Sequence, residues 1–240
     1  KGFLQAKTLR SEFVIGVEGT VAFRGEKYKN PHMPTGEIEV EVSRMEIFSE
    51  AETPPFPIED QAIVSEELRL QYRYLDLRRP LQSQRIQMRH KLTQKARQKL
   101  TEEGFIEIET PCLTKSTPEG ARDFLVPSRL RPGNFYALPQ SPQLFKQLSM
   151  VAGFDKYFQV VRCFRDEDIR ADRQPEFTQI DIEMSFPTEA AVMGLAERLV
   201  ASLFEELSLK PQEAVPKITY SDAMERYGCD KPDVRFGLEL

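Results

Sequence analysis

Apolar and polar side chains alternate over much of the first fifty residues, and this period of two predicts β-strands. The apolar set of the first stretch is Phe13, Ile15, Val17, Val21 and Phe23, and that of the second is Ile38, Val40 and Val42. Residues 25–36 between them are rich in residues that favour turns. Two or three antiparallel strands cannot bury a core alone, so we expect residues 1–50 to be the C-terminal part of a small β-barrel.

A proline-rich stretch at residues 53–57, Thr-Pro-Pro-Phe-Pro, interrupts the periodic pattern. Proline has no backbone N–H and a fixed φ, so helices and central strands are both disfavoured here. We therefore predict a linker or hinge over residues 51–83.

A helical period replaces the alternation from about residue 83. Met88, Leu92, Ala96 and Leu100 recur at a spacing of four, and Gly104 is placed to end this helix. Further strands are expected at residues 105–109, 135–138, 157–164 and 177–186, and further helices at residues 141–153 and 188–207. On the last helix we expect one apolar face, formed by Val192, Leu195, Ala196, Leu199, Val200, Leu203 and Leu207.

The strands at 157–164 and 177–186 are joined by a polar loop with no helix between them, which favours antiparallel pairing. The predicted fold class is therefore α+β, with part of a β-barrel followed by an antiparallel sheet flanked by helices. The sequence has no glycine-rich phosphate loop of the dinucleotide or P-loop form. Any nucleotide would have to be held in another way.

Composition is ordinary for a globular protein, with 40% hydrophobic and 30% charged residues. No apolar run approaches the roughly 20 residues of a membrane-spanning helix, and three widely spaced cysteines favour a reducing, cytoplasmic location. The net charge of −5 argues against a general nucleic-acid coat. Residues 69–99 nevertheless hold ten lysines and arginines against one acid, Asp76. This segment is either a solvated basic helix or an RNA-facing surface, and charge alone leaves both open.

The strand expected at residues 177–186 has an apolar and a polar face. Its apolar face consists of Ile180, Ile182, Met184 and Phe186, and its polar face of Phe177, Gln179, Asp181 and Glu183. Such polar faces are commonly solvated, but this one follows a loop in which four arginines balance four acids over residues 162–173. Rigid guanidinium groups in a neutral loop suit phosphates that are bound individually, and Phe177 is placed to stack on a purine.

Five segments of the chain resemble the class II aminoacyl-tRNA synthetases of the aspartate, asparagine and lysine subgroup. Residues 104–111 (GFIEIETP) are similar to motif 1 of that class, and residues 164–181 (FRDEDIRADRQPEFTQID) to motif 2. Residues 117–124 (TPEGARDF) and 139–147 (PQSPQLFKQ) are similar to the subgroup, and residues 227–237 (YGCDKPDVRFG) resemble the bacterial-type aspartyl-tRNA synthetases. The five segments stand in the order in which that family has them.

The resemblance implies an ATP-dependent ligase that activates L-aspartate to aspartyl-adenylate and transfers it to the 3′ end of tRNA(Asp), with Mg2+ bridging the ATP phosphates. Arg165 matches the catalytic arginine that grips the α-phosphate and the substrate carboxylate. Lys146 matches the partner of the substrate's side-chain carboxylate, and Asp181 and Glu119 match groups around its ammonium. The matching aspartate-binding set is Glu119, Ser141, Gln143, Lys146, Arg165, Gln179 and Asp181, and the ATP-binding set is Arg165, Asp166, Glu167, Gln174 and Phe177.

The same resemblance assigns partners to the chain. Asp168, Arg170 and Arg173 match contacts to the acceptor end of tRNA, and Pro111 matches a homodimer interface at motif 1. No metal ligand is assigned within this chain, and the lone histidines His32 and His90 receive no role. Taken singly, these residues have ordinary explanations: a helical lysine such as Lys146 is usually at the surface, Glu119 in a loop would be solvated, and Pro111 would merely end a strand.

Neither motif 3 nor the beginning of the barrel is found in this sequence, and its first residue is not Met. We expect an OB-like portion of an anticodon-binding domain at 1–50, a hinge at 51–83, a catalytic core with motifs 1 and 2 at 84–227, and the start of an inserted domain at 228–240. By itself the chain is expected to be inactive. Two alternatives stay open: a non-discriminating enzyme that also charges tRNA(Asn), and a synthetase-like binding or regulatory protein.

Overall fold

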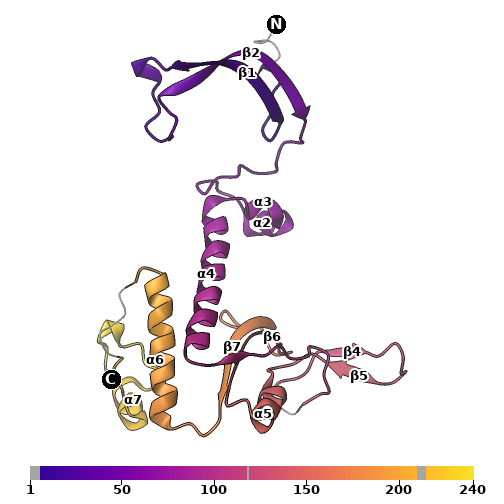
Figure 1. Ribbon diagram of the computed structural model, residues 1–240, viewed down its shortest axis with the longest axis vertical. Helices are drawn as coiled ribbons and strands as arrows, with labels where there is room; N and C mark the ends of the chain where they lie inside the picture. The colour runs from indigo at the N-terminus through magenta and orange to yellow at the C-terminus, as the bar shows by residue number, and fades with distance from the viewer. Residues whose placement is uncertain (1–5, 118, 210–214) are drawn as a thin grey trace. The chain divides into compact units, whose positions relative to one another are not determined.

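The computed structural model describes residues 6–117, 119–209 and 215–240, and it divides the chain into two compact units, Lys1–Arg85 and Ile86–Leu240 (Figure 1). Residues 1–5 of the predicted barrel portion, Pro118 of the segment at 117–124 and residues 210–214 of the predicted core lie outside the described residues. Helices and antiparallel strand pairs confirm the predicted α+β class. The finer domain boundaries stay predictions.

A long two-stranded ribbon forms most of the first unit. Strand β1 (Val14–Phe23) pairs antiparallel with β2 (Ile38–Ser49), and the short 3₁₀-helix η1 (Glu26–Tyr28) lies in the connection between them. Large apolar side chains of both strands are exposed. The ribbon therefore does not enclose a core by itself.

The apolar alternation of β2 stops at Val42 although the strand continues to Ser49, because the ribbon contains a β-bulge. Glu18 faces Arg44 whereas Gly19 faces Val42, so Ser43 is an extra residue on β2. The Ser43 hydroxyl donates to the Glu18 carbonyl oxygen at 3.0 Å. A bulge of this kind inverts the alternation beyond it, which moves the apolar positions of β2 from even to odd residue numbers and breaks the period.

The segment predicted as a linker contains two short helices that the sequence pattern did not reveal, α2 (Glu66–Gln71) and α3 (Arg73–Asp76). A buried polar network is centred on Asp76, the last residue of α3. The fully buried Asp76 carboxylate accepts hydrogen bonds from Arg73 at 2.5 Å and from Arg79 at 3.3 Å. Because a buried charge is costly unless it is paired, these two arginines are what allow Asp76 to lie inside.

Helix α4 (Pro80–Glu102) begins at a proline, a few residues before the predicted start. Proline is well tolerated there because the first helical N–H has no intrahelical partner. Near its other end Ala96 and Leu100 are wholly buried, and they join Phe105, Phe158, Leu195 and Leu199 in the core of the second unit.

A three-stranded sheet crosses the second unit in the order β3 (Ile106–Glu107), β6 (Lys156–Phe164), β7 (Glu176–Met184). β6 and β7 are antiparallel as predicted, whereas the short β3 pairs with β6 in parallel. The connection between β3 and β6 includes helix α5 (Gln143–Val151) and the hairpin of β4 (Leu125–Pro127) and β5 (Phe135–Ala137). A connection of that length permits a parallel crossover.

Helix α6 (Glu189–Glu206) starts at a Thr188 cap, whose hydroxyl accepts from the Ala191 N–H. Its buried side is narrower than predicted: Leu195, Leu199 and Ser202 are buried, but Val192, Ala196 and Val200 are exposed. The helix therefore covers the core with one stripe and leaves the adjacent stripe uncovered in the described residues.

The apolar face of β7 contacts this core through Ile182 and Met184. Phe186 was predicted to share that face, but β7 ends at Met184 and the Phe186 side chain is 98% exposed. Helix α7 (Tyr220–Tyr227) and the 3₁₀-helix η2 (Val234–Phe236) complete the unit, and α7 was not predicted. Among the described residues, no helix is both long and apolar enough to cross a membrane.

Candidate functional site

The polar face of β7 meets a matching face of β6. In the antiparallel register Cys163 lies opposite Phe177, Val161 opposite Gln179, Gln159 opposite Asp181 and Tyr157 opposite Glu183. Because directly opposed residues share a face of the sheet, all four polar-face residues predicted on β7 project to the side that Tyr157 and Cys163 line. The fold thus keeps the core on one side of β7 and polar chemistry on the other.

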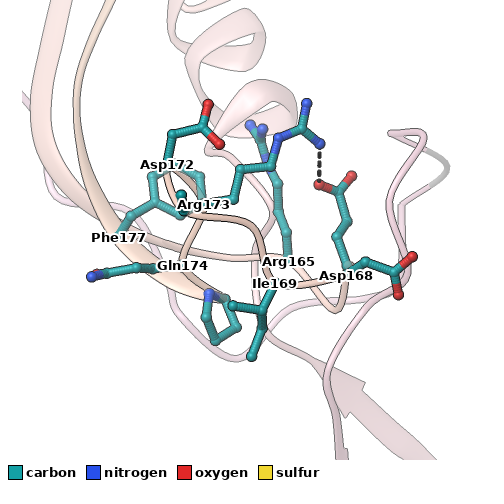
Figure 2. A pocket seen from close by; sticks show the side chains of 10 residues that line it. Arg165, Asp168, Ile169, Asp172, Arg173, Gln174 and Phe177 are labelled. Atoms are coloured by element: carbon teal, nitrogen blue, oxygen red, sulfur yellow. Dashed lines mark hydrogen bonds and ion pairs between the residues drawn. The ribbon is translucent and has the colours of Figure 1, made fainter.

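The loop between β6 and β7 returns as a narrow hairpin. At its base the Arg165 N–H donates to the Pro175 carbonyl oxygen at 2.8 Å, and near its tip Arg170 and Arg173 form a bridge. A cleft of about 580 Å³ opens at this hairpin (Figure 2). Its lining consists of Arg165, Glu167, Asp168, Ile169, Ala171, Asp172, Arg173, Gln174, Pro175 and Phe177.

Inside the cleft, the Arg165 guanidinium lies 5.0 Å from the centre of the Phe177 ring, within the range of a cation–π contact. The ion pair between Arg173 and Glu167, at 3.4 Å, crosses the hairpin and is the dashed line in Figure 2. Four of the five residues predicted to bind ATP therefore line one cavity: Arg165, Glu167, Gln174 and Phe177.

The fifth residue of that set, Asp166, lines a smaller cleft of about 310 Å³ on the hairpin. This cleft also includes the three residues predicted to contact tRNA, Asp168, Arg170 and Arg173, together with Arg122, for which sequence reasoning gave no role. Arg122 lies there because its backbone bridges to Asp166, and its Nε donates to the Asp166 carbonyl oxygen at 3.4 Å.

A buried charge cluster joins α5 to the polar face of β7. Lys146 is only 9% exposed, and its Nζ lies 2.9 Å from Asp181 Oδ1 and 3.3 Å from Glu183 Oε2. Burial acts to lower the pKa of Lys146, but the two carboxylates outweigh it and the pKa is raised. Lys146 is therefore a permanent cation. Sequence reasoning assigned no role to Glu183, although the alternation had placed it on this face.

Asp181 has an unused acceptor. Its Oδ2 is buried and has no hydrogen-bond partner among the described residues. Burial raises the pKa of Asp181, with the neighbouring charges of Glu183 and Glu119 adding to the rise and Lys146 opposing it. A buried acceptor without a donor is costly to the folded protein, so this oxygen is suited to receive a donor from a ligand, above all a cationic one.

Glu119 reaches the same region from the loop before β4. Its carboxylate accepts from the Ser141 hydroxyl at 2.8 Å and from the Thr117 hydroxyl at 3.3 Å, so it is held rather than freely solvated. The Ser141 hydroxyl also accepts from the backbone N–H of Gln143 at 3.3 Å, where α5 begins. Glu119, Ser141 and Gln143 are thereby brought together at one end of the helix that carries Lys146.

Gln179 is oriented by a cysteine that the sequence gave no reason to select. The Cys163 thiol donates to Gln179 Oε1 at 3.2 Å. Burial raises the pKa of the Cys163 thiol to about 11, so the group stays protonated and able to donate. Only the strand register, which places Cys163 on the same face, would have pointed to it.

The remaining predicted positions lie apart from these clusters. Pro111 is exposed just after β3, and His32 and His90 are exposed as well. The described residues contain no group of three His, Cys, Asp or Glu side chains that could hold a metal ion.

Comparison with known proteins places this geometry in context. Residues 65–240 match the family model described as tRNA synthetases class II (D, K and N). An aspartate–tRNA(Asp/Asn) ligase of Aquifex aeolicus is 61% identical over 98% of the chain, and an aspartate–tRNA ligase of Geobacillus kaustophilus is 58% identical over 98% of it. The chain covers 39% and 40% of these two proteins, so it spans about two fifths of their length.

Solved structures show the same fold. Asparaginyl-tRNA synthetase from Pyrococcus horikoshii, in complex with asparaginyl-adenylate, aligns with a TM-score of 0.69 at 28% identity over 85% of this chain and 45% of that one. A putative aspartyl-tRNA synthetase from Leishmania major aligns with a TM-score of 0.70 at 26% identity, over 84% of this chain and 40% of that one.

Proposed function

Because the chain belongs to the tRNA synthetases of class II (D, K and N), we propose that the full-length protein is an aspartate–tRNA ligase and that this chain holds part of its active site. The reaction would join L-aspartate to ATP as aspartyl-adenylate, with release of pyrophosphate, and then transfer the aspartyl group to the 3′ end of tRNA(Asp). The buried cluster of Lys146, Asp181 and Glu183 is the observation that supports aspartate most directly.

Recognition of aspartate needs one cation and several acceptors. Lys146 would bind the side-chain carboxylate of the substrate, and the unused Asp181 Oδ2 would accept a hydrogen bond from its ammonium. Glu119, held by Ser141, would supply a second negative charge near that ammonium. Because these charges are buried or half-buried, their interactions with a substrate are stronger than they would be in water.

Adenylate formation needs positioning and charge neutralisation rather than a protein base. The α-carboxylate of aspartate attacks the α-phosphorus of ATP, a new O–P bond forms, and the electrons of the broken P–O bond leave with pyrophosphate. Arg165 would neutralise the charge that develops on the α-phosphate oxygens. Phe177, Gln174 and Glu167 line the same cleft and would hold the adenine and its ribose phosphate chain.

Magnesium would enter with the nucleotide, where it neutralises phosphate charge. The smaller cleft, with Arg170 and Arg173, would receive the acceptor end of tRNA.

Pro111, which is exposed after β3, would lie in a homodimer interface. Sedimentation of the full-length protein tests this.

A second candidate is a non-discriminating ligase that also charges tRNA(Asn). The names of several relatives, including those from Aquifex aeolicus and a Geobacillus strain, include both tRNAs. Aminoacylation assays with tRNA(Asp) and tRNA(Asn) transcripts separate the two candidates.

We also propose a cytoplasmic location, which the three unpaired cysteines favour. Fractionation of the source cells tests this location.

The decisive experiment is Lys146→Ala in the full-length protein. We expect the KM for aspartate in ATP–pyrophosphate exchange to rise by roughly a hundredfold or more, because the variant loses a buried cation and leaves two carboxylates unpaired. The KM for ATP should change little. Lys217→Ala, at an exposed position of the same unit, is the matched control and should behave as wild type.

Equal losses for aspartate and ATP would show that Lys146 is structural and that the aspartate pocket is misassigned. Absence of aspartate-dependent exchange in the wild-type full-length protein would favour the remaining alternative, a synthetase-like binding or regulatory protein.

A further inference from the structure

Gln140 forms a buried clamp next to the candidate site. Its side chain is 2% exposed, and its amide pairs with both polar atoms of one residue, accepting from the Ala121 N–H at 3.1 Å and donating to the Ala121 carbonyl oxygen at 2.9 Å. The same Nε2 also donates to Asp123 Oδ1 at 2.6 Å. The Gln140 side chain thus binds the loop as a neighbouring β-strand would.

The backbone around Gln140 ties this loop to the motif 2 hairpin. The Phe164 N–H donates to the Pro139 carbonyl oxygen at 2.9 Å, and the Asp166 N–H donates to the Arg122 carbonyl oxygen at 3.0 Å. Gln140 therefore lies between the loop residues 121–123 and the residues on either side of Arg165. Glu119, two residues before Ala121, is bonded to Ser141, the neighbour of Gln140.

We propose that Gln140 is a positioning residue for aspartate activation. It touches neither substrate, but it fixes the loop at Ala121 and Asp123 so that the Glu119 carboxylate faces the substrate ammonium. This inference rests on the proposed function and adds to it a residue outside both predicted binding sets.

The chemistry of the clamp requires an amide. Methionine at this position would retain the volume but leave the N–H and carbonyl oxygen of Ala121 without their partner in a half-buried place. Glutamate would set a second carboxylate against Asp123, which already accepts from Ser116. Both substitutions should release the loop, and a misplacement of about 1 Å at a positioned group can cost on the order of a hundredfold in rate.

The test uses the full-length protein with Gln140→Met and Gln140→Glu in aspartate-dependent ATP–pyrophosphate exchange. We expect the KM for aspartate to rise at least tenfold while the KM for ATP stays within twofold. A purely structural role would reduce the amount of active protein, and so kcat, without changing the KM for aspartate. Gln147→Met, an exposed glutamine on α5, is the matched control and should leave both constants unchanged.

Limited trypsin digestion measures directly how firmly the loop is held, because Lys115 and Arg122 provide cleavage sites on either side of Glu119. Cleavage there should be faster in Gln140→Met than in wild type or Gln147→Met. Asp123→Ala removes the half-buried end of the clamp and should also raise the KM for aspartate. This variant tests the positioning role if the Gln140 variants do not fold.

The inference would be overturned if the folded Gln140 variants, or Asp123→Ala, keep the wild-type KM for aspartate within twofold. The proposed function would still stand in that case. Lack of aspartate-dependent exchange in the wild type would instead remove the proposed function itself.

Discussion

In the proposed aspartate pocket, individual charged side chains would bind both the ammonium and the carboxylate of the substrate. Lys146 alone is positive, whereas Asp181, Glu183 and Glu119 are negative, and Lys146 already pairs with the first two. Burial raises the pKa of Asp181, Lys146 opposes the rise, and the charges of Glu183 and Glu119 add to it. An arriving ammonium would relieve the excess of acids, and its counterpart carboxylate would compete for Lys146.

This charge balance gives aspartate binding a defined pH dependence. Asp181 must be ionised to accept the ammonium, so affinity should fall as the pH drops through its raised pKa. Glu183→Gln removes a like charge that raises this pKa, and the fall should therefore move to lower pH. Calorimetric titration of the full-length protein with aspartate at a series of pH values from neutral downward measures the shift.

Glu176→Gln is the matched control for that experiment. Glu176 lies on the same strand but pairs with Arg162 at the far end, at 3.2 Å. A midpoint that stays fixed or moves upward in Glu183→Gln would contradict the assigned role of Asp181.

At the scale of elements, the sequence predicts well wherever one periodic pattern persists. The ends of β6 and of α6 fall close to their predicted positions, and the motif 2 loop lies where the polar run indicates. β2 shows why other elements are missed, because one inserted residue, Ser43, inverts its alternation. α2 and α3 are too short to show a helical period at all.

The candidate site is predictable only in part, for a related reason. Alternation along β7 correctly groups Phe177, Gln179, Asp181 and Glu183 on one face, since that grouping is local. Contacts between distant segments, such as Cys163 with Gln179, depend on the β6–β7 register, which a single sequence does not display. The parallel pairing of β3 with β6 is missed likewise, because it is set by a long connection.

The junction of α4 with α6 should depend on pH through one acid. Glu103 follows α4 and binds Lys99 at 3.2 Å and Arg198 of α6 at 2.8 Å. Hydrogen bonds from Arg198 and then Lys99 lower the pKa of Glu103 to about 2. In the unfolded chain this carboxyl has its ordinary pKa of 4.5. The stabilisation is therefore complete above that pH and is lost as the pH falls toward 2.

We therefore expect Glu103→Gln to lower the free energy of unfolding at pH 7 by about 1 kcal/mol, a modest value because Arg198 is half exposed and solvent screens the pair. The difference from wild type should shrink at pH 3. Thermal unfolding followed by circular dichroism measures both. Glu102→Gln alters the adjacent acid, which accepts a hydrogen bond from the neutral Gln98 side chain, and should have little effect at either pH. Equal effects of the two substitutions would contradict the assignment.

At the scale of the whole molecule, the candidate site belongs entirely to the second unit, from Glu119 to Glu183. The chain spans about two fifths of the length of its relatives. For this reason the activity experiments above use the full-length protein. The basic stretch over residues 69–99 keeps both of its interpretations, although several of its cations have structural partners, among them Arg79 with Asp76 and Arg97 with Glu107.

The rate at which a buried thiol is labelled measures how often this unit opens. Cys112 and Cys229 are exposed and Cys163 is buried, so a disulfide reagent at pH 8 should label two thiols quickly and the third slowly. Burial also raises the pKa of the Cys163 thiol to about 11, so roughly one such thiol in a thousand is ionised at pH 8 while it stays buried. Rapid labelling of all three thiols in the native protein would contradict the burial of Cys163. In denatured protein all three should be labelled rapidly.

The third labelling rate would then report on a particular motion. Cys163 donates to Gln179 across β6 and β7, so reagent can reach its sulfur only when these strands or their cover separate. A ligand seated on the polar face of β7 should slow this reaction while the two exposed thiols keep their rates. The native cysteines thus report occupancy without any engineered residue, and the two exposed thiols supply the reference rate in the same molecule.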